Sequence, residues 1–253
     1  MTLYALPTNG ESGPIEPLGQ HRAVEAHPTK PIRVLLVDDH RALAEALSRL
    51  LAAEPGISVV GTAYSAAEAR NRLREPVDVV LMDFALPDGT GAEVTRAVKA
   101  RWPKTPVIML TAHDDDETVL ESIQAGADGF LSKTASTDEV IGAVRSAHAG
   151  ETLLPPAVIA KIAMRVRMAR ETGSEGIKYE PLTARELEVL RLLSAGRTTP
   201  EICEELAIAP NTLRTHVQNI TAKLHVHSKL EAVVFALRHG LVDPPTPEDR
   251  LYP

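Results

Sequence analysis

Between Pro31 and Gly150 the chain alternates short apolar runs with longer amphipathic stretches, and this alternation limits the possible folds more than any other feature. Uninterrupted apolar runs of this length are typical of strands that are buried on both faces of a parallel sheet. The runs are residues 34–37, 57–60, 77–82, 107–110 and 129–131. The sequence therefore predicts a sheet covered by helices on both sides.

The stretches between these runs have helical periodicity. They cover residues 41–53, 65–75, 91–101, 115–125 and 136–149. In the first, one helical face collects Leu43, Ala46, Leu47, Leu50 and Leu51. Five strand–helix pairs predict an α/β domain over residues 31–149, with a flavodoxin-like, doubly wound, five-stranded parallel sheet.

From Pro181 onward the pattern is entirely helical. Thr183 and Thr198 are each followed three residues later by glutamate, which is the capping-box signature of a helix start. Pro210 precedes a third helix, whose apolar stripe is Leu213, Val217, Ile220 and Leu224. Two such helices joined by a short turn predict an all-α helix-turn-helix domain over residues 181–241.

Three segments lie outside the two predicted domains. Residues 1–30 carry scattered Pro and Gly without a hydrophobic period and are interpreted as a flexible tail, residues 150–180 as a partly helical linker, and residues 242–253 as a C-terminal tail. The single cysteine, Cys203, cannot form an intramolecular disulfide, which fits a reducing compartment. Because no apolar run reaches transmembrane length and no signal sequence is visible, we expect a cytoplasmic protein without a membrane partner.

Polar side chains follow four of the predicted strands. Asp38 and Asp39 come after the first strand, Asp83 ends the third, Thr111 ends the fourth, and Lys133 follows the fifth. In open α/β sheets, ligands bind outside the carboxyl ends of the strands, so these side chains are expected to converge. Each one alone is more often a helix cap or a solvated surface residue; the joint pattern favours a site.

The predicted chemistry of this site is phosphoryl transfer. Clustered carboxylates repel one another unless a cation lies among them, and few hard oxygen ligands suit Mg²⁺. Thr111 can donate a hydrogen bond to a phosphoryl group and Lys133 can supply a positive charge. An aspartate can accept a phosphoryl group as an acyl phosphate, and Asp83 is the candidate because it is the central carboxylate.

The segments around these residues carry a family resemblance. They are Val37-Asp38-Asp39-His40, residues 82–91, Leu110-Thr111-Ala112 and Leu131-Ser132-Lys133. With their spacing, they resemble the receiver domain of bacterial two-component response regulators. The resemblance implies that Asp83 accepts phosphate from a sensor histidine kinase. It also implies a Mg²⁺ site made by Asp38, Asp39, Asp83 and the Ala85 carbonyl.

The resemblance further implies a switch. Thr111 and Lys133 are expected to move towards the phosphoryl group and to propagate a change to the surface of the fourth and fifth strand–helix units. Phe130 stands where the family usually has tyrosine or another aromatic residue that changes rotamer. Phenylalanine keeps the ring but lacks the hydroxyl that could form a hydrogen bond, so the active rotamer is expected to be held less firmly.

The third helix of the C-terminal domain has a polar face suited to DNA. The net charge of the chain is −7, so a DNA-binding surface must be local, and no acidic residue lies between Leu206 and Leu230. Arginine can read guanine, amides can read adenine, and lysine and threonine more often hold phosphates. The candidate DNA contacts are Asn211, Thr212, Arg214, Thr215, Gln218 and Lys223.

Residues 181–241 resemble the LuxR-type helix-turn-helix of the NarL/FixJ class. The matching segments are residues 182–190, Ala195-Gly196 and residues 212–224. The resemblance implies that the helix from Thr212 enters the major groove. It also implies that the last helix pairs two subunits, with Glu231, Val234, Phe235 and Arg238 as the candidate dimerisation residues.

Together these features predict a DNA-binding response regulator and not an enzyme. Phosphorylation would unmask the DNA-binding domain, favour a homodimer and control its binding to promoter half-sites. RNA polymerase is a further candidate partner. Three alternatives stay open. A signalling module without DNA binding is disfavoured by the acid-free helix, a receiver-regulated enzyme by the short C-terminal region, and a ligand-driven receiver by the intact acidic set.

Overall fold

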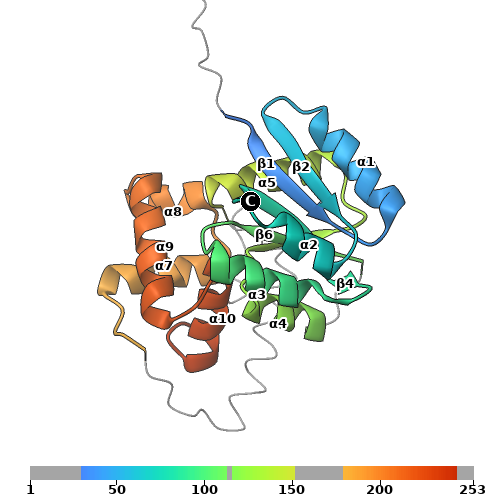
Figure 1. Ribbon diagram of the computed structural model, residues 1–253. Coiled ribbons are helices and arrows are strands. Elements are labelled where there is room, and N and C mark those ends of the chain that lie inside the picture. Colours follow the sequence, from blue (N-terminus) through green and yellow to red (C-terminus); the bar gives the residue numbers. More distant parts are fainter. Residues whose placement is uncertain (1–29, 113–115, 152–178, 244–253) are drawn as a thin grey trace, which may run out of the picture. The chain divides into compact units, whose positions relative to one another are not determined.

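Five parallel strands form one sheet in the order β2-β1-β3-β6-β7 (Figure 1). Their bounds are β1 Ile32–Val37, β2 Ile57–Ala63, β3 Val79–Asp83, β6 Val107–Thr111 and β7 Gly129–Ser132. The strand order reverses between β1 and β3, which is the doubly wound topology that places a ligand crevice at the carboxyl ends of these strands. The predicted flavodoxin-like fold is confirmed.

The structure is a computed structural model and describes residues 30–112, 116–151 and 179–243. The predicted N-terminal tail and most of the predicted linker and C-terminal tail lie outside these ranges. The described residues from Pro31 onward belong to one compact unit. Within the described residues, no helix is both long enough and apolar enough to cross a bilayer.

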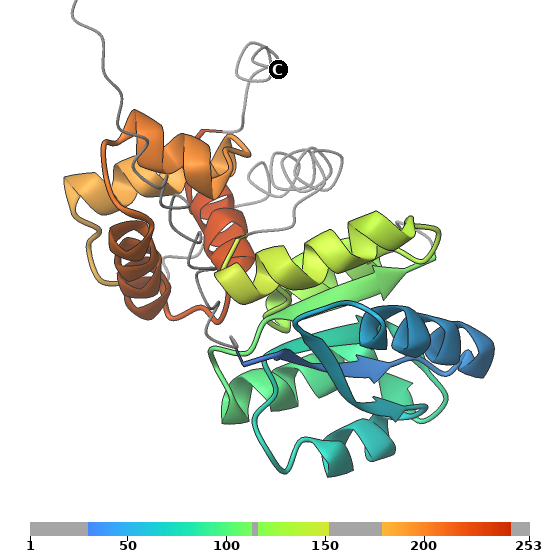
Figure 2. The same cartoon turned by 90° about the horizontal axis from the view of Figure 1, so that it is seen from above.

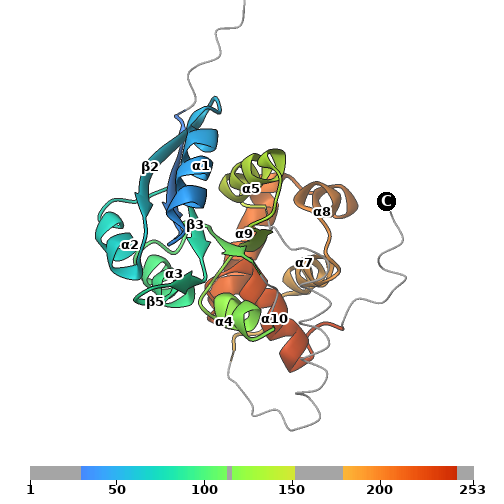
Figure 3. The ribbon, with the colours of Figure 1, turned by 90° about the vertical axis from the view of Figure 1, so that its right-hand side faces the viewer.

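Helices cover both faces of the sheet (Figure 3). Helices α1 and α5 pack on one face, and α2, α3 and α4 pack on the other. Their bounds are α1 Arg41–Ala52, α2 Ala66–Arg72, α3 Gly91–Arg101, α4 Asp116–Gln124 and α5 Thr137–Ala149. The amphipathic stretches of the sequence therefore form helices close to the predicted positions.

The central strands are apolar at every position because both sides of the sheet are covered. On β1, Leu35 points into the cluster with α2, α3 and α4, whereas its neighbour Leu36 points into the cluster with α1 and α5. Successive side chains on a strand alternate between faces, so a strand buried on both sides has no polar position. Full burial of each leucine stabilises the fold by about 1.5–3 kcal/mol.

A short antiparallel hairpin after β3 was not predicted. It consists of β4 Ala85–Leu86 and β5 Gly89–Thr90, and it leads directly into α3. At Gly91, the first residue of α3, a Cβ atom would lie 2.1 Å from the backbone oxygen of Asp83. Only glycine fits there, so this position fixes the approach of the hairpin to the end of β3.

Four helices follow the second gap, namely α7 Ala184–Ser194, α8 Thr199–Glu205, α9 Pro210–Leu224 and α10 Lys229–His239 (Figure 2). Both predicted capping boxes are present, Thr183 with Glu186 and Thr198 with Glu201. Pro210 occupies the first turn of α9, as expected. The buried residues of α9 are Leu213, Ile220 and Leu224, three of the four predicted stripe positions. The helix-turn-helix is α8 and α9.

Candidate functional site

Three carboxylates converge at the carboxyl ends of β1 and β3. Asp38 is fully buried after β1, and Asp83 ends β3 with 4% of its surface exposed. Asp39 has a side chain that is 36% exposed. One ligand atom from each of these residues and from His40 lies within 4.8 Å of the others. The topology of the sheet therefore brings together residues that are 45 positions apart, as the sequence predicts.

Lys133 neutralises this cluster. Its Nζ atom lies 2.7 Å from Asp83 Oδ2 and 3.0 Å from Asp38 Oδ2. The backbone places it there, because the Lys133 amide donates a 2.8 Å hydrogen bond to the carbonyl of Thr111. Burial lowers the pKa of Lys133, but the hydrogen bonds to Asp83 and Asp38 outweigh burial and leave the pKa raised. The ammonium is therefore charged at neutral pH.

Asp83 has a raised pKa. Burial is the largest cause; the Lys133 hydrogen bond opposes it, and the charge of Asp38 raises the pKa further. The Asp83 carboxylate thus lacks full compensation from Lys133 alone. Asp38 is fully buried as well, and the Lys133 Nζ atom 3.0 Å from its Oδ2 atom is shared with Asp83, so one ammonium faces two buried carboxylates. A small divalent cation would fit these oxygens.

The other predicted members of the acidic site lie around the three carboxylates. Thr111 ends β6 and is 8% exposed. The Ala85 amide donates a 3.4 Å hydrogen bond to Asp83 Oδ1, which places Ala85 beside the Asp83 carboxylate. Phe130, on β7, is 4% exposed and packs in the cluster that also contains Met109. The structure therefore places the ring of Phe130 inside the fold.

The polar face of α9 is largely exposed. Asn211, Thr212, Arg214, Thr215 and Gln218 are all exposed. Leu213 and Ile220 anchor the opposite face in the core. This geometry is the one required of a helix that enters a groove of DNA.

Lys223 forms an ion pair within the C-terminal helical domain. Its Nζ atom lies 2.7 Å from Oε2 of Glu186, a residue of α7 that is 3% exposed. Burial raises the pKa of Glu186, but the hydrogen bonds from Lys223 and Thr183 outweigh it and leave the pKa lowered. The assignment of Lys223 to DNA stays a prediction, and this ion pair would have to break before Lys223 could reach a phosphate.

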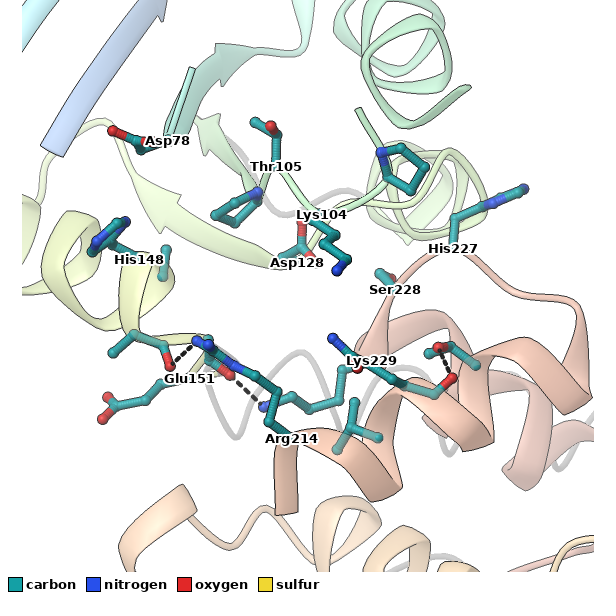
Figure 4. Close-up of a pocket in the computed structure, with 18 of the residues that line it drawn as sticks. Asp78, Lys104, Thr105, Asp128, His148, Glu151, Arg214, His227, Ser228 and Lys229 are labelled. Atoms are coloured by element: carbon teal, nitrogen blue, oxygen red, sulfur yellow. Dashed lines mark hydrogen bonds between the residues drawn. The ribbon is translucent and has the colours of Figure 1, made fainter. Parts of the chain in front are cut away.

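Two cations of the C-terminal helices bind the end of α5 (Figure 4). Arg214 donates a 3.0 Å hydrogen bond to the Ala149 carbonyl, and Lys229 donates a 2.9 Å bond to the Gly150 carbonyl. A Cβ atom at Gly150 would lie 3.1 Å from the guanidinium of Arg214, so the contact is close. These residues line a cleft of about 1130 Å³.

Comparison with known proteins identifies both parts of the chain. Residues 34–145 match the response regulator receiver domain, and residues 180–236 match the bacterial regulatory proteins of the luxR family. The chain belongs to the response regulators with a LuxR-type DNA-binding domain. The resemblance stated from the motifs is therefore confirmed.

Curated relatives match more than four fifths of the chain. The transcriptional regulatory protein LiaR of Bacillus subtilis is 38% identical over 213 residues, which are 84% of this chain and 100% of LiaR. The response regulator protein VraR of Staphylococcus aureus is 36% identical over 83% of this chain and 99% of VraR. Among solved structures, the response regulator ChrA is 30% identical over 84% of this chain and 100% of its own, with a TM-score of 0.45.

The candidate dimerisation residues of this response regulator lie on α10 with different exposures. Val234 is 5% exposed, and Phe235 packs edge-to-face on Tyr179 with 5.7 Å between the ring centroids. Glu231 accepts a 2.7 Å hydrogen bond from the His227 amide. Arg238 is exposed. Because α10 also contacts α4, the buried members could pair with a second copy only after α10 changes its surroundings.

Sequence reasoning missed two residues of these sites. In the sequence, Lys229 is only one of the cations near the acid-free third helix, and His40 is only the last residue of the receiver-like segment Val37-Asp38-Asp39-His40. The Lys229 contact joins residues far apart in the sequence, and the His40 contact depends on the direction of the side chain; hydrophobic periodicity encodes neither. The clearest available signal for His40 was its position directly after two aspartates.

Proposed function

We propose that this response regulator is phosphorylated on Asp83 by a sensor histidine kinase and that phosphorylation controls its binding to DNA. The observation that carries the proposal is the bridge from Lys133 to both Asp38 and Asp83 at the carboxyl end of the sheet. It supplies a nucleophile and a cation at one point, within a chain of the response regulator family.

The phosphoryl step is a displacement at phosphorus. A carboxylate oxygen of Asp83 forms a P–O bond while the P–N bond to the kinase histidine breaks, and the imidazole leaves. Bound Mg²⁺, held by Asp38, Asp39, Asp83 and the Ala85 carbonyl, would supply charge neutralisation for the phosphoryl oxygens. Lys133 then exchanges its contact with Asp83 for the new phosphoryl group, and Thr111 donates a hydrogen bond from the end of β6.

Double-stranded DNA is the proposed target of α9. Its exposed face has Arg214 and Gln218 for base edges and Thr212 and Thr215 for phosphates. Asn211 begins the same face. A homodimer through α10 would read two promoter half-sites, and RNA polymerase is the proposed partner at the promoter. The proposed compartment is the cytoplasm.

The contact between α9 and α5 supports a resting state in which the DNA-binding domain is masked. Arg214 cannot hold the Ala149 carbonyl and a base at the same time. Packing of α10 on α4 likewise restricts the helix proposed for pairing. Phosphorylation at the opposite edge of the sheet would favour release of both contacts, so that DNA binding and dimerisation rise together.

The test measures the intact mass of the full chain after incubation with acetyl phosphate and Mg²⁺. Wild type is expected to gain one phosphoryl group, and Asp83→Asn is expected to gain none. Asp88→Asn serves as the matched control, because Asp88 lies on the same loop but caps α2 through the amides of Ala66 and Ala67. A phosphorylated Asp83→Asn protein would refute the assignment. DNA binding is then compared before and after phosphorylation, where equal affinities would refute the coupling.

A further inference from the structure

Three cations line the cleft between α5 and the C-terminal helices (Figure 4). Arg214 enters from α9, Lys229 from α10, and Lys104 from the loop that precedes β6. This loop and α5 belong to the receiver domain, so both domains form the cleft. Its volume of about 1130 Å³ is enough for a small molecule, since drug-sized ligands occupy pockets of about 300–1,000 Å³.

None of these cations is neutralised by an ion pair within the part of the chain that the structure describes. Arg214 and Lys229 donate hydrogen bonds to the neutral carbonyls of Ala149 and Gly150. Lys104 is exposed and forms no hydrogen bond or ion pair with another described residue. Moving a cation out of water without an anion beside it costs free energy. The cleft therefore holds positive charge that its own hydrogen bonds do not cancel.

The acidic residues that line the cleft do not supply the missing charge. Asp128, in the loop before β7, already accepts a 2.6 Å hydrogen bond from the Lys99 ammonium. Asp78 accepts a 2.8 Å hydrogen bond from a backbone amide of β1. Burial is the largest influence on Lys229 and lowers its pKa to about 8, although Asp128 and Glu151 raise it. The charge of Lys229 is thus incompletely compensated where it lies.

A phosphate oxyanion matches this arrangement. A guanidinium binds phosphate through two parallel N–H groups, and an ammonium binds it as a point charge. The bond from Arg214 to the Ala149 carbonyl uses only Nη2, which leaves its other N–H groups for a ligand. A diphosphate offers oxyanions to several cations at once, as a cleft formed by two domains requires.

We propose that this cleft binds a small phosphate-bearing anion with two or more negative charges, held by Arg214, Lys229 and Lys104. Because both domains supply ligands, the anion binds the masked arrangement more tightly than the released one. At ten times its dissociation constant, it would favour masking by about tenfold. This regulatory effect rests on the masked state of the proposed function, whereas binding of the anion does not.

The first measurement is a calorimetric titration of the full-length protein with pyrophosphate, at constant ionic strength and without divalent cations. Lys104→Met and Lys229→Met are each expected to lose about tenfold in affinity, which corresponds to one charge-assisted hydrogen bond. The matched control is Lys30→Met, which removes an exposed lysine outside the cleft and should bind as wild type does. The absence of binding by wild type would overturn the proposal, as would equal affinities of wild type and Lys104→Met.

The second measurement separates the cleft from the DNA-binding face, because pyrophosphate could also compete with DNA for the exposed cations of α9. Fluorescence anisotropy with a labelled DNA fragment is recorded with and without pyrophosphate. Pyrophosphate should weaken DNA binding by wild type but not by Lys104→Met, whose α9 is unchanged. Equal inhibition of the two proteins would overturn the regulatory effect. A chain that binds pyrophosphate through Lys104 but binds no DNA would contradict the proposed function and still support the anion site.

Discussion

At the scale of the residue, the ionised form of Asp83 lowers the stability of the fold, and the same carboxylate is the proposed phosphoryl acceptor. Its pKa is raised by burial against the opposing Lys133 hydrogen bond, so the folded protein holds a proton on Asp83 more tightly than the unfolded chain does. Ionisation therefore costs stability as pH rises from the ordinary carboxyl range through the raised pKa. A charge that the fold tolerates poorly suits the proposed role of Asp83 as the phosphoryl acceptor.

Asp83→Asn should therefore raise the free energy of unfolding at pH 7, because it removes the buried charge at nearly constant shape. Asp88→Asn should lower it. The amides of Ala67 and Ala66 lower the pKa of Asp88, so its ionised form stabilises the fold. Urea unfolding of both variants beside wild type measures the two signs. An Asp83→Asn protein that is less stable than wild type would contradict the account.

At the scale of the element, α7 and α9 are joined by a partly buried ion pair between Lys223 and Glu186. Glu186 serves twice, as the third residue of the capping box and as the partner of Lys223. The sequence shows the capping box, but it does not show that Lys223 crosses to the same carboxylate. The pair fixes how α9 presents its exposed face.

Lys223→Met should lower the free energy of unfolding by about 1–3 kcal/mol, because it leaves a buried carboxylate without its charged partner. The double variant Lys223→Met with Glu186→Gln should recover part of this loss, since the unpaired charge is gone. Thermal or urea unfolding of the three proteins gives the comparison. If Lys223 served only to hold DNA, Lys223→Met would leave stability unchanged.

At the scale of the whole molecule, Lys229 is expected to make the proposed masked state sensitive to pH. Burial lowers the pKa of Lys229 to about 8, although Asp128 and Glu151 raise it, and Arg214 lowers it further. Released from this contact, the amine would return towards its ordinary value of about 10.4. The masked state binds fewer protons, so rising pH above about 8 favours masking.

Unphosphorylated protein should thus bind DNA more weakly at pH 9 than at pH 7, by up to about tenfold. Lys229→Met should remove most of this dependence, because methionine does not titrate. Fluorescence anisotropy with one labelled operator fragment at constant ionic strength measures both proteins. Parallel pH profiles for wild type and Lys229→Met would show that Lys229 does not govern the equilibrium.

The sequence by itself determined the two folds, their order and the family. Buried parallel strands appear in the sequence as uninterrupted apolar runs, and capping boxes appear as a fixed spacing between two residues. The acidic site appears as polar residues at the predicted strand ends. All three are local signals. The β4–β5 hairpin carried no such periodicity, because each strand has only two residues.

Only the tertiary structure decided the partners of Lys223, Lys229, Arg214 and His40. Each of these side chains is polar and reaches an acceptor chosen by packing: Lys223 and Arg214 cross to other helices, Lys229 reaches the end of α5, and His40 turns towards the carboxylates. Hydrogen bonds and ion pairs depend on direction and distance after folding. The apolar pattern that specifies the fold does not predict these hydrogen bonds and ion pairs.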